Sequence, residues 1–126
     1  HAISYAMTIR YGIPHGMAVA LTLGPMLRFN ASVSSADCTD PKGADHVLSR
    51  IARLLELLGQ PTAGKGADRI RSLIDSVGAP HCLRDVGIRS AEEIAWLARQ
   101  ANAERLSNNP RAMTTQDIEM ILEEIR

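Results

Sequence analysis

The amino-acid sequence predicts an all-α protein, an irregular bundle of about six helices. Aromatic residues make up only 3% of the 126 residues, whereas Ala, Leu, Ile and Arg, which suit helices better than strands, are plentiful. No alternating run of β-branched residues occurs, and apolar residues recur at spacings of three and four throughout the chain. Because no internal repeat is visible, we expect one irregular helical domain.

The first two helices are expected to be separated by a short, sharp break. Residues 1–10 have the pattern of the end of a helix, which Gly12 and Pro14 should terminate. A second helix is expected from about Gly16 to residue 30. It is apolar on nearly every side, so it should be central and buried, and Pro25 should kink or divide it.

Four further helices are expected after a polar loop at residues 31–43. Gly59 and Gly78 are natural stops for the first two of them. Ser90 should begin the next helix, because Glu93 follows it at the spacing of a capping box. The four helices are expected over residues 44–58, over residues 64–77, from Ser90 onward, and from Thr114 or Thr115 to the end of the chain.

Composition excludes several classes of partner. Fourteen basic and fourteen acidic residues give a formal net charge of zero, so we expect no nucleic-acid partner. The most apolar stretch, Met17–Leu27, is shorter than the roughly 20 residues that cross a bilayer, so we expect no membrane partner. Cys38 and Cys82 lie in unrelated contexts, which predicts free thiols and a cytoplasmic location.

His1 and His15 are the candidate metal ligands. In one straight helix they would lie about 21 Å apart at 1.5 Å per residue, too far to share an ion. The break at Gly12–Pro14 allows the chain to reverse and bring them together. The positive end of the second helix would also disfavour protonation of His15, and metals bind the neutral imidazole. From the spacing alone, two ordinary structural histidines are the alternative.

The residues around these two histidines resemble a known family signature. His1-Ala2-Ile3-Ser4-Tyr5, followed by Tyr11-Gly12-Ile13-Pro14-His15-Gly16, is similar to the second signature of the iron-containing (group III) alcohol dehydrogenases. The connector 78–88 and the segment Asn108–Arg111 with the terminal helix also resemble that family. The resemblance therefore assigns residues 1–126 to the C-terminal helical, metal-binding domain of a dehydroquinate synthase-like fold.

The resemblance implies a metal site and a nucleotide cofactor. His1 and His15 would be two of four metal ligands. The other two, an Asp and a His, are expected on a helix that precedes these residues in chains of the family. The Gly-rich turns that hold a dinucleotide are expected in an N-terminal nucleotide-binding domain outside these residues. Fe(II) is the expected metal, with zinc as the alternative, and the nucleotide would be NAD or NADP.

Tyr5 is a candidate for the proton path. It stands where many members of the family have a second histidine close to the nicotinamide. Its hydroxyl can donate and accept a hydrogen bond, but a phenol gives up its proton less readily than an imidazolium ion does.

The implied function is that of a fragment of an alcohol dehydrogenase or aldehyde reductase. Its substrate would be a small-molecule alcohol or aldehyde, and the isolated chain should be inactive. An apolar face left exposed should favour a homo-oligomer. The alternatives are a non-catalytic helical module and the domain of a glycerol-dehydrogenase-like zinc polyol dehydrogenase.

The two other histidines are not expected to bind a metal. His46 and His81 have no metal-binding partner at a suitable spacing in the sequence. A catalytic pair of His81 with Cys82 is not expected either, because adjacent side chains rarely face each other.

Several remaining residues have structural interpretations. Gly64-Lys65-Gly66 follows no strand, so we do not expect it to be a phosphate-binding loop. Trp96 is expected to pack its helix, and the residues expected to fill the core are Met7, Met17 and Met26.

Overall fold

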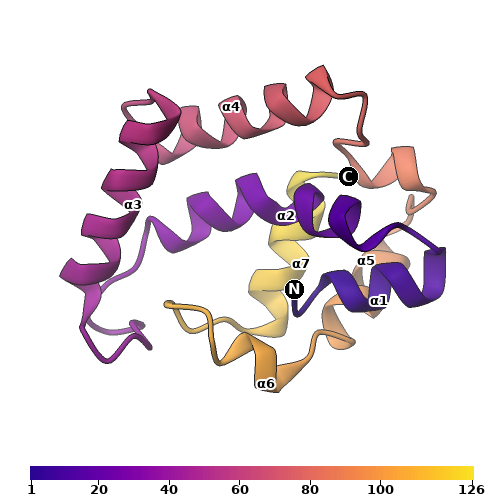
Figure 1. Ribbon diagram of the computed structural model, residues 1–126. Coiled ribbons are helices and arrows are strands. Elements are labelled where there is room, and N and C mark those ends of the chain that lie inside the picture. The colour runs from indigo at the N-terminus through magenta and orange to yellow at the C-terminus, as the bar shows by residue number, and fades with distance from the viewer.

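A computed structural model describes all residues from His1 to Arg126 and is entirely helical (Figure 1). The only β-type pairing is an isolated bridge between Cys38 and Arg111. The helical fold and the six expected helices are confirmed, and the short α6 and the 3-10 helix η1 are additional. The elements are α1 Ser4–Tyr11, α2 His15–Asn30, α3 Ala44–Leu58, α4 Ala63–Ser76, η1 Leu83–Val86, α5 Ala91–Arg99, α6 Ala103–Leu106 and α7 Thr115–Glu124.

Helix α2 runs through the middle of the molecule and packs against α1, α4 and α7 (Figure 1). Of the two effects expected of Pro25, a kink or a division, the division is wrong because the helix is continuous from His15 to Asn30. Pro25 is buried. The expectation of burial on nearly every side is also wrong. Met17 is 39% exposed, and Leu23, which lines an open groove, is 50% exposed.

Small residues allow α4 to approach α2 and α3 closely. A Cβ atom placed on Gly24 of α2 would lie 3.4 Å from the Cβ of Ala67 in α4. On Gly66, it would lie only 2.6 Å from Cδ2 of Leu55 in α3. The Gly64-Lys65-Gly66 segment therefore lies inside a helix, where Gly66 serves close packing.

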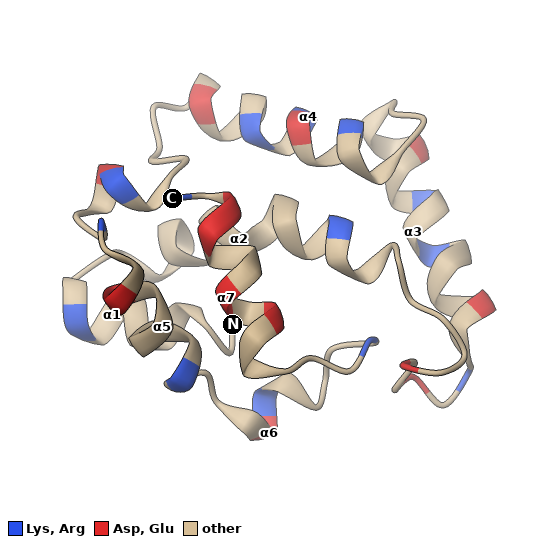
Figure 2. Ribbon diagram, turned by 180° about the vertical axis from the view of Figure 1, so that it is seen from behind, with Lys and Arg blue, Asp and Glu red and all other residues tan.

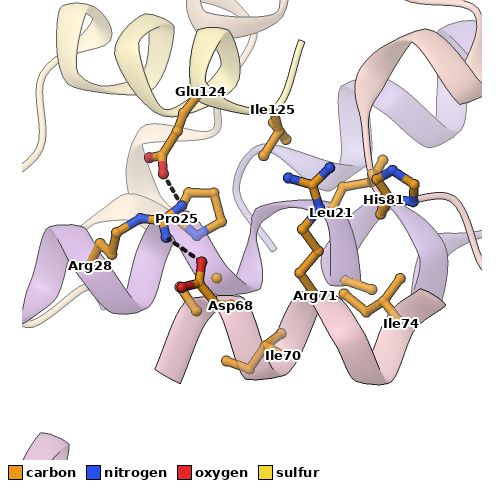
Figure 3. Close-up of a pocket in the computed structure, with 13 residues that line it drawn as sticks. Leu21, Pro25, Arg28, Asp68, Ile70, Arg71, Ile74, His81, Glu124 and Ile125 are labelled. Atoms are coloured by element: carbon orange, nitrogen blue, oxygen red, sulfur yellow. Dashed lines mark hydrogen bonds and ion pairs between the residues drawn. The ribbon is translucent and has the colours of Figure 1, made fainter. Parts of the chain in front are cut away.

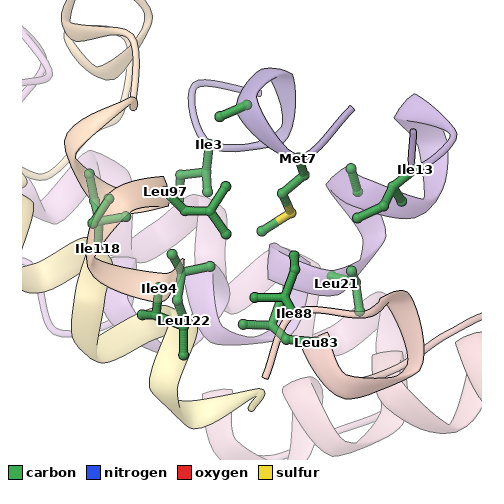
Figure 4. Close-up of a cluster of buried hydrophobic side chains, with 13 residues drawn as sticks. Ile3, Met7, Ile13, Leu21, Leu83, Ile88, Ile94, Leu97, Ile118 and Leu122 are labelled. Atoms are coloured by element: carbon green, nitrogen blue, oxygen red, sulfur yellow. The ribbon is translucent and has the colours of Figure 1, made fainter. Parts of the chain in front are cut away.

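The main hydrophobic core lies between α1, α2, η1, α5 and α7 (Figure 4). Leu83 and Ile88 of the connector are fully buried in it, and the Leu83 N–H donates a 2.7 Å hydrogen bond to the Ile125 carbonyl. Met7 is fully buried, as expected, whereas Met17 does not fill the core. The buried residues of the cluster are Ile3, Ala6, Met7, Ile13, Ala18, Leu21, Leu83, Ile88, Ile94, Leu97, Ala98, Ile118 and Leu122.

Side-chain caps define the starts of the last helices. Ser90 and Glu93 form the expected capping box of α5. Thr114, rather than Thr115, caps α7, and Asp117 completes a second capping box there. At the beginning of the chain, α1 starts at Ser4 and not at His1; the Ser4 hydroxyl donates to the His1 carbonyl at 3.0 Å.

A polar network joins the segment before α7 to the end of α2. The side-chain amides of Asn30 and Asn109 exchange two hydrogen bonds, at 2.9 and 2.8 Å. Asn109 also donates to the Arg111 carbonyl at 2.7 Å. Arg111 in turn donates to Asp37 at 2.7 Å and to the Phe29 carbonyl at 2.8 Å. The network fixes two segments that lie about eighty positions apart in the sequence.

Basic and acidic residues are interspersed along α3 and α4 (Figure 2). No helix has both the length and the apolar character needed to cross a membrane.

Substitution of Asn109 by alanine should destabilise the protein by about 1–3 kcal/mol, because it leaves the partly buried amide of Asn30 without its partner. Asn108→Ala is the matched control, since the exposed side chain of Asn108 makes no hydrogen bond. Urea unfolding of the two variants measures the difference. Equal stabilities of the two variants would contradict the role given to Asn109.

The Glu93 cap should make the stability of the folded protein depend on pH in the acidic range. Backbone N–H groups of Arg89 and Ser90 donate to the Glu93 carboxylate and lower its pKa from 4.5 to about 2. A lowered pKa in the folded state adds stability above the unfolded value, and this stability is lost as the pH falls from about 4.5 toward 2.

Glu93→Gln should therefore lose less of its stability over this pH range than the unsubstituted protein does, although it is less stable at neutral pH. Urea unfolding at a series of pH values tests this, with Glu92→Gln as the control because Glu92 makes no capping hydrogen bond. Parallel pH profiles for the original protein and Glu93→Gln would show that the cap does not titrate as described.

Candidate metal centre

The chain reverses between α1 and α2 through a three-residue break. Gly12 ends α1 with φ of +66°, a left-handed conformation that suits glycine, and its N–H donates to the Thr8 carbonyl at 3.1 Å. Pro14 is extended, with φ −52° and ψ 133°, and its carbonyl accepts the first hydrogen bonds of α2. His15 is consequently the first residue of α2, where the helix end carries partial positive charge.

This reversal places the two predicted ligands side by side. Nδ1 of His1 lies 3.1 Å from Nε2 of His15, and the ring centroids are 5.1 Å apart. Both side chains are exposed, so the pair opens toward solvent. The structure therefore brings together two imidazoles from positions fourteen residues apart.

The spacing of the two nitrogens fits a shared metal ion. Metal–nitrogen bonds of about 2.0–2.1 Å put two ligand nitrogens roughly 2.9 Å apart in octahedral geometry and roughly 3.4 Å apart in tetrahedral geometry. The observed 3.1 Å lies between these values. Two imidazoles at an open edge also leave room for the further ligands that a complete centre needs. The role of His1 and His15 as ligands remains a prediction.

Tyr5 lies next to this pair. Its ring centroid is 5.3 Å from that of His15, and its side chain is 38% exposed. The guanidinium of Arg105 lies over the Tyr5 ring, 4.6 Å from its centroid. Tyr5 is thus positioned within the candidate centre, and its role in a proton path remains a prediction.

Arg105 is the residue of this site that sequence reasoning missed. It belongs to α6, a helix of four residues that is too short to show an apolar period. Asn102 caps α6 by accepting from the Arg105 N–H at 2.9 Å, and its own N–H donates to the Ala2 carbonyl at 3.3 Å. The capping side chain of Asn102 was the one available signal in the sequence.

Two hollows adjoin the site, and Arg105 lines both. One, of about 300 Å³, lies beside His1 and extends to Met113. The other, of about 480 Å³, lies beside Tyr5 and is bounded by Trp96. Trp96 packs against the core as expected, and Arg10 covers its ring at 4.1 Å. Arg105 thus places a positive charge next to each hollow.

The two remaining histidines lie away from this site. His46, near the start of α3, lines a wide apolar groove of about 710 Å³ between α2, α3 and α4. The groove contains Leu54 and Leu73, which are 50% and 44% exposed. It is an exposed apolar face of the kind expected from the sequence, and self-association through it remains a prediction.

His81 has neighbours that the sequence did not suggest. The donor atoms of His81, Cys82 and Asp85 all lie within 4.8 Å of one another. The expectation that His81 lacks metal-binding partners is therefore wrong, because the turn into η1 folds the three residues together. The Cys82 thiol and the His81 backbone N–H lower the pKa of Asp85 below its ordinary value.

His81 also contributes to a small pocket of about 60 Å³ between α2, α4 and the end of the chain (Figure 3). In this pocket Arg28 of α2 forms ion pairs with Asp68 of α4 and Glu124 of α7. The pocket is far too small for an organic substrate. Its ion pairs connect α4 and α7 to the central helix.

The family model described as the Fe-containing alcohol dehydrogenase family, C-terminal, matches residues 1–126. The chain belongs to this family.

Individual relatives agree with this assignment. The chain is 36% identical to a phosphonoacetaldehyde reductase of Streptomyces viridochromogenes, over 98% of the chain and 30% of that protein. It is 30% identical to the lactaldehyde reductase of Escherichia coli strain K12, over 94% of the chain and 30% of that protein. The chain thus spans about 30% of the length of these relatives.

A solved structure shares the fold. All of this chain superposes on 32% of a 1,3-propanediol oxidoreductase, with a TM-score of 0.67 and 23% sequence identity. The helical arrangement is therefore that of the C-terminal domain of this family.

Proposed function

We propose that the protein carrying these residues is an NAD(P)-dependent, metal-dependent alcohol dehydrogenase that also reduces aldehydes, and that His1 and His15 are two of its metal ligands. The observation that carries this proposal is the 3.1 Å separation of two imidazole nitrogens in a chain of the Fe-containing alcohol dehydrogenase family. The remaining ligands and the nucleotide-binding residues would come from outside residues 1–126.

The role of this chain is to hold and orient the reacting groups. His1 and His15 supply imidazole nitrogen donors from two segments whose relative placement is fixed by the Gly12–Pro14 break. When bound, a divalent metal supplies Lewis acidity to the substrate oxygen, which favours hydride transfer between the substrate and the nicotinamide. Imidazoles combined with a carboxylate suit Fe(II), and zinc binds such a set as well.

Tyr5 is the candidate for moving a proton between the site and solvent. Its ring lies against both the His15 ring and the Arg105 guanidinium, which restricts its orientation. Its hydroxyl accepts or donates a hydrogen bond, and its partial exposure gives it contact with water. We propose that Tyr5 passes the proton of the substrate hydroxyl to solvent.

The substrate is proposed to be a small polar aldehyde or alcohol. The relatives named above act on phosphonoacetaldehyde and lactaldehyde, both of which carry a polar group close to the carbonyl. In this chain Arg105 provides a positive charge beside both hollows at the site. That charge suits a substrate with an anionic group, because a guanidinium binds phosphonates and carboxylates well.

Two alternatives have different consequences. A glycerol-dehydrogenase-like enzyme would carry zinc and oxidise polyols at the same two histidines. A non-catalytic helical module would need neither histidine.

The free thiols of Cys38 and Cys82 fit a reducing cytoplasm, which we propose as the location of the protein.

Substitution of His15 by alanine in the full-length protein should remove one bound metal ion per chain and lower NAD(P)-dependent alcohol oxidation by more than about 100-fold. Loss of a group that only supports a ligand already costs roughly 10–100-fold. Metal analysis of the purified protein and steady-state kinetics measure the two effects, and the same analysis distinguishes iron from zinc.

His46→Ala is the matched control for this experiment. His46 lies in the apolar groove and makes no contact with the candidate centre, so its loss should leave metal content and turnover unchanged. Unchanged metal content and activity in His15→Ala would replace the enzyme proposal with that of a helical module.

The 126-residue chain expressed alone should show no NAD(P)-dependent turnover. None of its glycines forms a phosphate-binding turn, and Gly64 and Gly66 lie within α4. A spectrophotometric assay of nicotinamide reduction with small alcohols measures this directly. Turnover above that of a His15→Ala version of the same chain would contradict the expectation.

A further inference from the structure

We propose that His81, Cys82 and Asp85 form a second, structural metal site, suited to zinc and separate from the pair His1 and His15. The site would consist of an imidazole nitrogen, a thiolate and a carboxylate oxygen. These three donor types come together where the connector after α4 turns into η1. The proposal does not depend on the catalytic function proposed above.

The donors are close enough to bind one ion after small side-chain movements. Their ligand atoms all lie within 4.8 Å of one another, and Nδ1 of His81 is 3.9 Å from Oδ2 of Asp85. Zinc bonds of about 2.0–2.3 Å place the ligands of a tetrahedral ion roughly 3.3–3.6 Å apart. The most distant atoms must therefore approach each other by up to about 1.5 Å, which rotation of partly exposed side chains allows.

The hydrogen bonds of Asp85 do not consume its capacity to bind a metal. Its Oδ2 accepts both backbone N–H groups, from His81 and Cys82, each at 3.2 Å. Its other carboxylate oxygen accepts no backbone hydrogen bond. These two bonds also hold the backbone of His81 and Cys82 next to the carboxylate. The cap of η1 thereby pre-organises the three residues instead of competing with the ion.

Asp75 is a fourth residue next to this cluster and brings a second carboxylate to it. Its Oδ1 lies 2.5 Å from Nδ1 of His81. Nδ1 is also the nitrogen that faces Asp85, so the ion would replace this contact, and Asp75 would remain beside the site as a further carboxylate. Asp75 lies in the last turn of α4, so the interaction links that helix to the connector.

The choice of donors favours zinc over the hard cations. A thiolate and an imidazole bind zinc well, whereas magnesium and calcium prefer sites made of oxygen. Binding would convert the Cys82 thiol to a thiolate, with the proton released to solvent. The consequence is structural: the ion would join the end of α4 to η1, whose Leu83 is fully buried in the core.

Cobalt(II) is the probe that tests this site, because it replaces zinc and absorbs in the near ultraviolet when bound to a thiolate. The full-length protein is stripped of metal with a chelator and titrated with Co(II). The pair His1 and His15 contains no sulfur, so a thiolate-to-cobalt absorption reports only a site that includes a cysteine.

The absorption should be present in the unsubstituted protein and in Cys38→Ser, and absent in Cys82→Ser. His81→Ala should weaken cobalt binding by about 10–100-fold, and His15→Ala should leave the thiolate absorption unchanged. Cys38→Ser is a matched control because Cys38 has a similar partial exposure but belongs to no such cluster.

Two results would overturn the proposal. One is the absence of thiolate absorption when the unsubstituted protein is given two equivalents of Co(II). The other is its persistence in Cys82→Ser. Circular dichroism of Cys82→Ser verifies that the helices are intact. Either result would leave the catalytic proposal untouched, because that proposal is tested at His15 by metal content and turnover.

Discussion

The reversal of the chain at Gly12–Pro14 is the constraint on which the arrangement of this domain depends. A left-handed glycine ends α1, and an extended proline begins α2 in a different direction. Without the break, the two histidines would lie about 21 Å apart along one helix. With it, their nitrogens are 3.1 Å apart, and α1 packs against α2. The same turn therefore forms both the first helix pair of the fold and the candidate metal centre.

The candidate centre lies at the edge of a rigid core. Ile3 and Met7 of α1 and Ile13 of the break are buried in the main cluster, which anchors the segments that carry His1, Tyr5 and His15. The polar side chains face outward from this anchor, so they remain open to solvent and to further ligands. The buried residues thus fix the backbone in the core, while the candidate site residues lie on the exposed surface. This division suits a site that is completed by a second domain.

The parts of the molecule far from this centre have mainly structural roles. The amide pair of Asn30 with Asn109, and the contacts of Arg111, connect the end of α2 to the segment before α7. Asn109 and Arg111 belong to the segment that resembles the family, and the structure explains them through hydrogen bonding. Close packing similarly accounts for Gly24 and Gly66, two glycines that lie within helices. At the end of α4, the cluster around His81 could serve the same purpose with a metal ion.

The sequence by itself determined the helices, their main ends and the pair of histidines worth comparing, because apolar period, caps and the Gly-x-Pro-His break are local signals. Tertiary packing decided what depends on distant contacts. It keeps α2 continuous through Pro25 while leaving Leu23 exposed, and it brings Arg105 of the short α6 to Tyr5. It also folds His81 and Cys82 onto Asp85. The physical reason is that the placement of the helices and the directions of their side chains depend on contacts between residues far apart in the sequence. Local spacing does not specify these contacts.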